Sequence, residues 1–441
     1  MKGAGSTGVS EKGTVIVALS GFAVALGKTL SGRSGLIGLL INLTLFSVFS
    51  AGYLKTLFPL RFALALLIVV LGVCAAFSEY APAERRVRRR NLAVLLTLGV
   101  LVIAATVLTS ATLLPGELDK VFRYVVVIPA AFVVGTQLAD PAVRQMWMSS
   151  YRFWALLFAG AAIVEFLTGR LFFPREGFVV SLGSLTFRSL VLSEHSLVLA
   201  TLLVAGVPYL ALIRSRARRV VAVAVTGVAI WTTGSSGPLI LFGLVLLGFL
   251  VARAGWLRPA LWARLLRWGT MTVLAALLLL GTVLAYDRQI IVTSTTDDAS
   301  AQYRLALYAS VWPSVLERPL GWGIAGIPEG LLLIPSAGRI IDLSRTIDSE
   351  FVLLALEFGW IGVIVAFALV LLVFRTRALT TPVGQSVLLI TSAGFFLALH
   401  AWLGLSALWL LQLGMLYAMR RGGDAGVGAG AGAQVASRST E

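Results

Sequence analysis

The sequence predicts an all-α, polytopic integral membrane protein. The chain of 441 residues is 58% hydrophobic and only 13% charged, whereas about a quarter of the residues in a soluble domain carry charge. Its mean hydropathy of +0.93 is too apolar for an intrinsically disordered chain. Apolar runs of the roughly 20 residues that a helix needs to cross a bilayer recur along most of the chain.

About twelve of these runs predict transmembrane helices. A further run over 15–27 is short, and we expect it to re-enter or lie on the membrane; if it crosses, about thirteen helices result. The helices form one membrane domain, 1–421, and the Gly-, Ala- and Ser-rich stretch 422–441 is predicted to be a disordered cytoplasmic tail. The predicted helices are 35–53, 58–80, 92–114, 124–139, 153–169, 196–213, 219–234, 238–255, 268–286, 351–374, 383–401 and 403–419.

The distribution of positive charge predicts the orientation, because cytoplasmic loops carry an excess of Lys and Arg. If the helices alternate, about two thirds of the 36 Lys and Arg residues fall on one side. We expect that side to be the cytoplasm and the protein to be a multi-pass protein of the cytoplasmic membrane. The formal net charge of +16 is then mostly topological and does not indicate a nucleic-acid partner. The densest basic clusters are 85–90, 214–219, 253–267, 375–377 and 420–421.

Two loops on the predicted external face exceed turn length, 170–195 and 287–350. The second is predicted to be a large helical loop, with a helix over 299–316 and a turn at 318–323. It contains acids and Arg but no Lys, and Arg suits bidentate recognition of phosphate or carboxylate. The alternative is that Arg simply replaces Lys throughout this chain. The Arg residues of the second loop are Arg288, Arg304, Arg318, Arg339 and Arg345.

The composition excludes several kinds of chemistry. Cys74 is the only cysteine, and His195 and His400 are the only histidines, so the chain has no zinc site built from clustered Cys and His. The predicted cytoplasmic loops are short and leave no domain to bind a nucleotide sugar. If the protein is an enzyme, we therefore expect its activated substrate to arrive in the membrane. We expect no cofactor. Glu165, Glu357 and His400 lie in or near predicted helices, where we favour packing or hydrogen bonding over chemistry.

Three segments carry a recognisable pattern. The first, at 187–197, reads Phe-Arg-Ser-Leu-Val-Leu-Ser-Glu-His-Ser-Leu, and the second, at 232–237, reads Thr-Thr-Gly-Ser-Ser-Gly. The third, at 304–362, includes Pro-Leu-Gly-Trp-Gly, Ile-Asp-Ser-Glu-Phe and Glu-Phe-Gly-Trp-Ile-Gly. In this order and topology the segments resemble the O-antigen ligase and polymerase superfamily. Its members are GT-C-like polytopic glycosyltransferases whose donor is a glycan linked to polyprenyl diphosphate.

The chain departs from the family pattern at three places. His195 stands where the family commonly has Pro. Ser236 stands where the family commonly has Arg, which weakens the expectation that this turn binds an anion. Asp348 and Ser349 stand where ligases commonly have His-Asn and polymerases often have Asp-Asn, so Asp348 favours a polymerase.

The resemblance implies an inverting, metal-independent transfer of the glycan to an acceptor hydroxyl at the outer face of the membrane. Cleavage of the glycosidic bond places negative charge on the diphosphate, and positioned Arg side chains stabilise that charge. Arg188 and Arg304 are the first candidates for this role, followed by Arg318, Arg339 and Arg345. The alternatives are an ion pair with a nearby Glu for Arg188 and a surface position on a helix for Arg304.

The acceptor hydroxyl must also lose a proton. Asp348 and Glu350, at the start of a predicted helix, are the candidate catalytic bases. Asp348 is alternatively a helix N-cap, since Asp is favoured there. Glu194 and His195 precede another helix and are candidate substrate ligands, with capping as the alternative.

The expected partners are the lipid-linked donor, a sugar or lipid-linked acceptor, membrane lipid and envelope-assembly proteins. Trp312 and Trp322 complete the candidate ligands as rings that stack on sugars, although an interfacial aromatic belt also explains their positions. A transporter or flippase for a lipid-linked glycan is a second candidate function, disfavoured because the charges concentrate at helix ends. A non-catalytic subunit of an envelope-assembly complex is a third, kept open by the missing Arg at Ser236.

Overall fold

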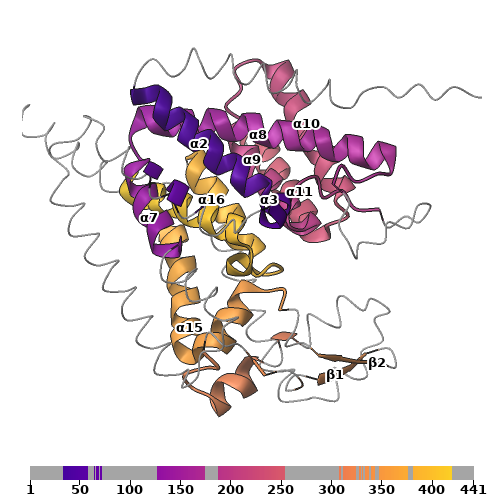
Figure 1. Cartoon of the computed structure of the whole chain (residues 1–441), viewed down its shortest axis with the longest axis vertical. Coiled ribbons are helices and arrows are strands. Elements are labelled where there is room, and N and C mark those ends of the chain that lie inside the picture. Colours follow the sequence, from indigo (N-terminus) through magenta and orange to yellow (C-terminus); the bar gives the residue numbers. More distant parts are fainter. Residues whose placement is uncertain are drawn as a thin grey trace, which may run out of the picture.

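The computed structural model of the protein consists of a helical bundle joined to a smaller lobe (Figure 1). The structure describes residues 33–57, parts of 64–71, 127–173, 187–253, most of 307–323, parts of 327–342, 347–375 and 381–419.

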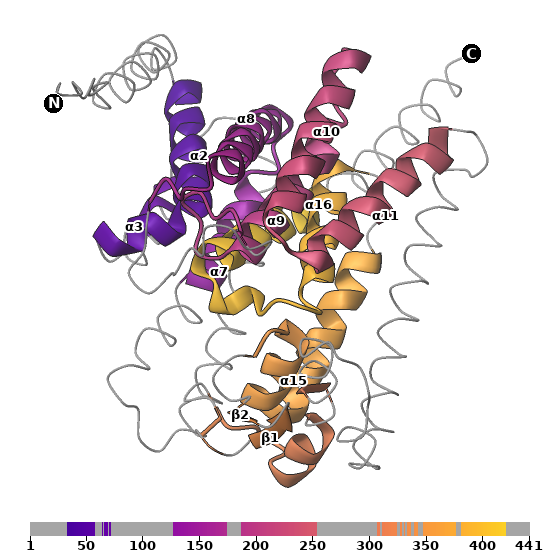
Figure 2. The ribbon, with the colours of Figure 1, turned by 90° about the vertical axis from the view of Figure 1, so that its right-hand side faces the viewer.

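The bundle is organised around α9 (Ser196–Leu210), whose residues are apolar and buried on nearly every side. The other bundle helices are α2 (Arg33–Phe49), α3 (Ala51–Leu57), α7 (Ile128–Gln137), α8 (Pro141–Thr168), α10 (Arg216–Thr232), α11 (Ser236–Arg253), α16 (Pro382–Ala393) and Leu403–Met419. A helix that is hydrophobic all round is buried all round. Accordingly, α8, α10, α11 and α16 all pack against α9, as Figure 2 shows from the side.

The local sequence determines both ends of α8. The Asp140 carboxylate caps the first turn by accepting the backbone N–H of Ala142 at 2.9 Å. Pro141 occupies the first turn, where its missing N–H leaves no hydrogen bond unmade. The helix ends at Gly169, which adopts a left-handed φ of 61°. These signals place the start of α8 well before residue 153, where we predicted it.

The lobe forms around the first half of α15 (Glu350–Arg375). All described residues of the helix predicted over 299–316 are helical. They pack against α15 through a small apolar core that contains Leu307, Val311, Val315, Val352 and Leu356. This core is separate from the main core of the bundle.

The large loop was predicted to be helical, but it also contains two strands. β1 (Leu333–Ser336) and β2 (Arg339–Asp342) form an antiparallel hairpin in which Leu333 pairs with Asp342. The β-branched pair Ile340 and Ile341 favours the extended conformation. The backbone N–H of Gly330 donates to the Asp342 carboxylate at 2.8 Å and ties the base of the hairpin to the preceding turn.

Two described helices are long and apolar enough to cross a membrane, namely Pro141–Thr168 and Glu350–Ala368. Several shorter apolar helices coincide with predicted spans. The helix predicted over 383–401 is wrong in extent, because α16 ends at Ala393 with Gly394 as its C-cap. The short 3-10 helix η5 (Leu399–Ala401) then precedes the final helix. The number of spans stays a prediction, since some predicted segments lie outside the described residues: 92–114, 268–286, 15–27 and the tail 422–441.

Candidate functional site

A turn of the large loop packs against a break in α15. The helix is interrupted at Gly359, whose φ of 57° and ψ of −135° are not helical. The break leaves the Leu356 carbonyl free to accept the Trp322 N–H at 2.9 Å. A Cβ on Gly321 would lie 2.5 Å from the backbone of α15, and one on Gly359 would overlap the Pro319 carbonyl. Gly321 belongs to Pro-Leu-Gly-Trp-Gly and Gly359 to Glu-Phe-Gly-Trp-Ile-Gly. These two sequences of the third segment therefore form one close backbone contact.

Three residues of the lobe that we predicted to bind substrate, Arg318, Trp312 and Trp322, take part in contacts with aromatic rings. The guanidinium carbon of Arg318 lies 3.8 Å from the centroid of the Trp322 ring, a cation–π geometry. The rings of Trp312 and Trp360 lie 5.6 Å apart. Trp360 is 41% exposed, so this pair presents aromatic surface on the outside of α15. Arg318 and both predicted tryptophans thus lie in one part of the molecule, around the break in α15.

Residues 394–402, called here the connecting segment, join α16 to the final helix and contact the start of α15. The Gly394 carbonyl accepts the backbone N–H of Glu350 at 2.8 Å and the Ser349 hydroxyl at 3.3 Å. The Phe395 carbonyl accepts the Tyr308 hydroxyl at 2.7 Å. Tyr308 and the start of α15, both within the third sequence segment, are therefore held by a stretch of chain that follows α16.

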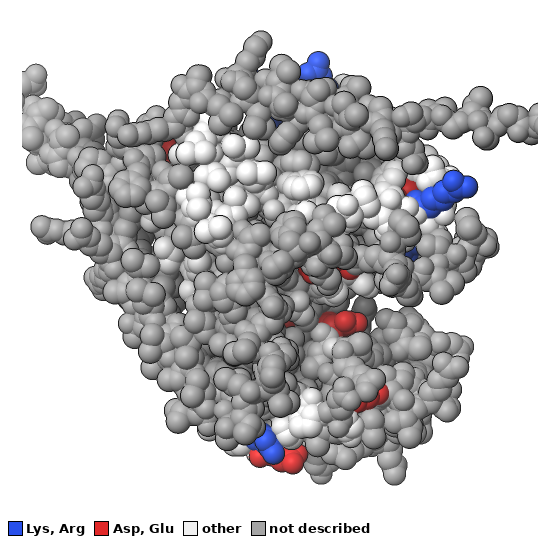
Figure 3. Space-filling model, in the orientation of Figure 1, with Lys and Arg blue, Asp and Glu red and all other residues white. Residues whose placement is uncertain are grey.

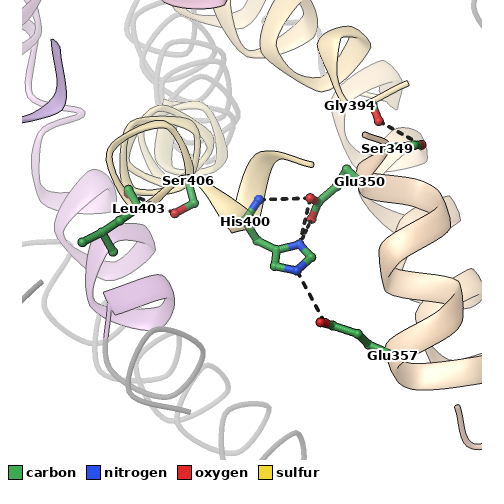
Figure 4. A network of polar contacts seen from close by, with 7 residues as sticks. All are labelled: Ser349, Glu350, Glu357, Gly394, His400, Leu403 and Ser406. Atoms are coloured by element: carbon green, nitrogen blue, oxygen red, sulfur yellow. Dashed lines mark hydrogen bonds and ion pairs between the residues drawn. The ribbon is translucent and has the colours of Figure 1, made fainter. Parts of the chain in front are cut away.

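His400 of the connecting segment lies between two buried carboxylates of α15 (Figure 4). Its Nδ1 is 2.8 Å from each carboxylate oxygen of Glu350, and its backbone N–H donates to the same carboxylate at 3.0 Å. Its Nε2 is 3.4 Å from the Glu357 carboxylate. Burial by itself would lower the pKa of His400. The negative charges of Glu350 and then Glu357 raise the pKa by a larger amount, so that it is about 10. At neutral pH the imidazole is therefore a cation that joins two acids.

The connecting segment also contacts the first and second sequence segments. A Cβ on Gly237 would lie 2.8 Å from the Phe396 ring, so the first turn of α11 approaches this ring closely because glycine is present. The Trp402 ring lies 5.7 Å from the ring of His195. His195 is the N-cap of α9, and its Nδ1 accepts the Leu197 N–H at 3.2 Å. All three segments thus meet at the connecting segment.

Arg188 lies over the turn between α10 and α11. Gly234 in that turn has a φ of 64°, and a Cβ there would lie 3.2 Å from Cγ and 3.3 Å from Nε of Arg188. The Arg188 side chain is exposed. It has no ion pair or hydrogen bond with any residue that the structure describes. The alternative of an ion pair with a nearby Glu is therefore not realised with Glu194, and Arg188 offers an available cation beside the turn.

The loop that carries Arg188 is held by Glu165 near the end of α8. The fully buried Glu165 carboxylate accepts three backbone N–H groups, from Phe172 at 3.0 Å, Leu190 at 2.9 Å and Val191 at 2.8 Å. Val191 has a φ of 53°, an unfavourable conformation for a β-branched residue. A charged acceptor strengthens each of these hydrogen bonds. Glu165 thus has the hydrogen-bonding role that we favoured, and it fixes the backbone beside Arg188.

The two candidate bases have different environments. Asp348 is exposed, immediately before α15, whereas Glu350 is 3% exposed and bonded to His400. Ser349 lies between Asp348 and the first helical residue. Figure 3 shows acidic side chains, in red, where the lobe meets the bundle. The structure therefore separates one accessible carboxylate from one that is buried in a polar network.

The remaining candidates are placed only in part. Glu194 is half-buried at the start of α9, next to His195. Arg339 lies in β2, but its side chain is outside the described residues, as are Arg304 and Arg345 entirely.

Sequence reasoning missed the role of the connecting segment, because its apolar residues continued the helical run of α16. Two features of the sequence point to it in retrospect. Gly394 precedes the pair Phe395 and Phe396, which suits a helix end followed by a packed turn. His400 is one of only two histidines in the chain.

Comparison with known families supports the resemblance found in the sequence. Residues 221–367 match the family model described as O-antigen ligase. The match covers less than half of the chain, from α10 to the middle of α15. Neither the curated proteins nor the solved structures gave a match. Three parts of the candidate site lie outside the matched range. Arg188 and the connecting segment contact residues within it, and Glu165 holds the loop that carries Arg188.

Proposed function

We propose that this protein transfers a glycan from polyprenyl diphosphate to an acceptor sugar hydroxyl, at the outer face of the cytoplasmic membrane. In this reaction the bond between the anomeric carbon and the diphosphate oxygen breaks, and the diphosphate leaves with the electron pair. The acceptor oxygen forms the new bond from the opposite face and gives its proton to a carboxylate. The match to the O-antigen ligase family supports the substrate class.

The observation that carries the proposal is the position of Arg188 over the turn at Gly234. The family commonly has Arg in this turn, whereas this chain has Ser236. Arg188, from a different loop, places a guanidinium beside the same turn without an intramolecular counter-ion among the described residues. The Arg188 guanidinium can thus replace the positive charge that an Arg at position 236 would bring to the turn. In this position it can bind the leaving diphosphate.

Asp348 is the better candidate for the base. Asp348 is exposed and lies two residues before the start of α15 at Glu350, so an acceptor hydroxyl can reach its carboxylate. The Glu350 carboxylate is instead bonded to the imidazole and backbone of His400. We assign Glu350, with His400, to positioning the start of α15, on which Asp348 depends for its place.

The test uses the full chain in lipid nanodiscs with polyprenyl-diphosphate glycans extracted from the membranes of the source organism. Growth of the lipid-linked glycan identifies a polymerase, which the presence of Asp348 at the family's His position favours. Movement of the glycan to a chemically different acceptor identifies a ligase. The variants Arg188→Ala and Asp348→Asn are expected to fold and to form product at least about 10²-fold more slowly than the wild type. Normal product from both variants would refute the proposal.

A further inference from the structure

A surface groove lies between α8 and α10, formed by residues that the site does not use. It has a volume of about 530 Å³. Its apolar lining includes Leu156 of α8, Val221 and Val225 of α10, and Ile213, which lies just before α10. Arg218 also lines the groove, in the first turn of α10. The lining is thus apolar along its length and cationic at one end.

The positive charge at this end has no counter-charge among the residues that the structure describes. Arg214, Arg216 and Arg218 are exposed and have no ion pair with any described residue. The sequence contains no Asp or Glu at all between Ser196 and Arg253. These Arg residues therefore remain available to a ligand from outside the chain.

The position of the Arg residues makes an anionic partner energetically favourable. The N-terminus of a helix carries partial positive charge, so acidic residues stabilise the first turn and basic residues oppose it. The first turn of α10 has no acid, and it begins with Arg216 and includes Arg218 and Arg219. Of these, Arg219 donates to the Ala211 carbonyl at 3.2 Å. A bound anion would offset both the Arg charges and the helix dipole.

We propose that this groove binds one anionic phospholipid, with an acyl chain along Leu156, Val221 and Val225 and the phosphate at Arg218. Val221, which lines the groove, and its neighbour Val220 are both exposed and suit contact with hydrocarbon. A zwitterionic lipid fills the apolar part equally well, but it brings no net negative charge to the three unpaired Arg residues. The site therefore discriminates by headgroup charge. This proposal is independent of the glycan-transfer function.

The test measures lipid retention by native mass spectrometry on the detergent-purified full chain. The probes are phosphatidylglycerol and phosphatidylcholine with identical acyl chains. We expect the wild type to retain one phosphatidylglycerol in preference to phosphatidylcholine. Arg218→Gln should weaken phosphatidylglycerol binding about fivefold, since an Arg near an anionic headgroup contributes about 1 kcal/mol. The matched control is Arg170→Gln, an exposed Arg just beyond the other end of α8, which should have no effect.

A second variant tests the groove itself without a change of charge. Ala217 lines the groove and is exposed, so Ala217→Trp fills the groove without disturbing the core. It should reduce phosphatidylglycerol binding while the melting temperature stays unchanged. Equal retention of the two lipids by the wild type, or equal effects of the two Arg variants, would overturn the proposal. Displacement of the lipid by millimolar inorganic phosphate would also overturn it, because the site would then take a free anion.

Discussion

The imidazole of His400 lies 2.8 Å from the carboxylate of Glu350 and 3.4 Å from that of Glu357. Both acids are buried on α15 and lie seven positions apart in the sequence, which is close to two helical turns. One protonated histidine therefore contacts both carboxylates and reduces the repulsion between them. This interaction attaches the connecting segment to the helix that carries Asp348.

Removal of His400 should destabilise the protein more than removal of the whole charged network. His400→Gln leaves two buried carboxylates without a cation, and loss of one partner of a buried pair costs about 3–5 kcal/mol. The triple variant Glu350→Gln, Glu357→Gln and His400→Gln leaves no charge and should recover most of that loss. Thermal unfolding in detergent measures both. Equal melting temperatures for the single and the triple variant would contradict the assignment of His400 as the shared cation.

The stability should fall as the pH rises above neutrality. The pKa of His400 is about 10 in the folded protein and 6.5 in the absence of interactions. Between these values the folded state keeps a proton that the unfolded state has lost, so the contribution is fully present below pH 6.5 and disappears towards pH 10. The slope for one proton is at most about 1.4 kcal/mol per pH unit. Melting temperatures across this range should show it, and the triple variant should lack it.

Arg188 should be needed for turnover but not for folding. Arg188→Ala removes an exposed side chain, so its melting temperature should match the wild type, while loss of one charge-stabilising donor lowers the rate about 10²- to 10³-fold. Arg188→Lys should recover only part of this rate, because Lys cannot make a bidentate contact with a phosphate. Product formation in nanodiscs gives the rates. Full activity of Arg188→Ala would remove Arg188 from the site.

Glu165 should affect the same reaction through the backbone. Glu165→Gln removes the charge that strengthens hydrogen bonds to Phe172, Leu190 and Val191, and hydrogen bonds to charged groups contribute about 1.5–3 kcal/mol each. We expect a lower melting temperature together with reduced activity. The control is Arg188→Ala, which should lose activity alone. A Glu165→Gln variant with wild-type stability and activity would show that the carboxylate does not position the loop.

The break in α15 should tolerate only glycine. Gly359→Ala places a Cβ into the Pro319 carbonyl at a left-handed φ, so we expect loss of folded protein. Gly160 in α8 provides the matched control, because a Cβ there meets nothing within 4 Å. Gly160→Ala should stabilise by up to about 1 kcal/mol, the usual difference between Ala and Gly within a helix. Size-exclusion profiles and melting temperatures separate the two outcomes.

The sequence predicted the presence of most described bundle helices, because each is a local apolar run, although it misplaced the start of α8 and the end of α16. It also identified the segments that meet at the site, since their glycines and acids stand out against an apolar background. It did not predict how they meet. Phe396 packs against Gly237 just after α16 ends, and the role of Glu165 depends on a loop that returns to it. Both are tertiary contacts between residues distant in the chain.

The connecting segment has a consequence for biosynthesis. It follows every other element of the candidate site in the sequence, yet it contacts Tyr308, Glu350, Gly237 and His195. A nascent chain that has made only α8 to α15 therefore lacks the contacts that hold these residues. These contacts can form only after the connecting segment has been synthesised, so the candidate site assembles late, after α8 to α15 are complete.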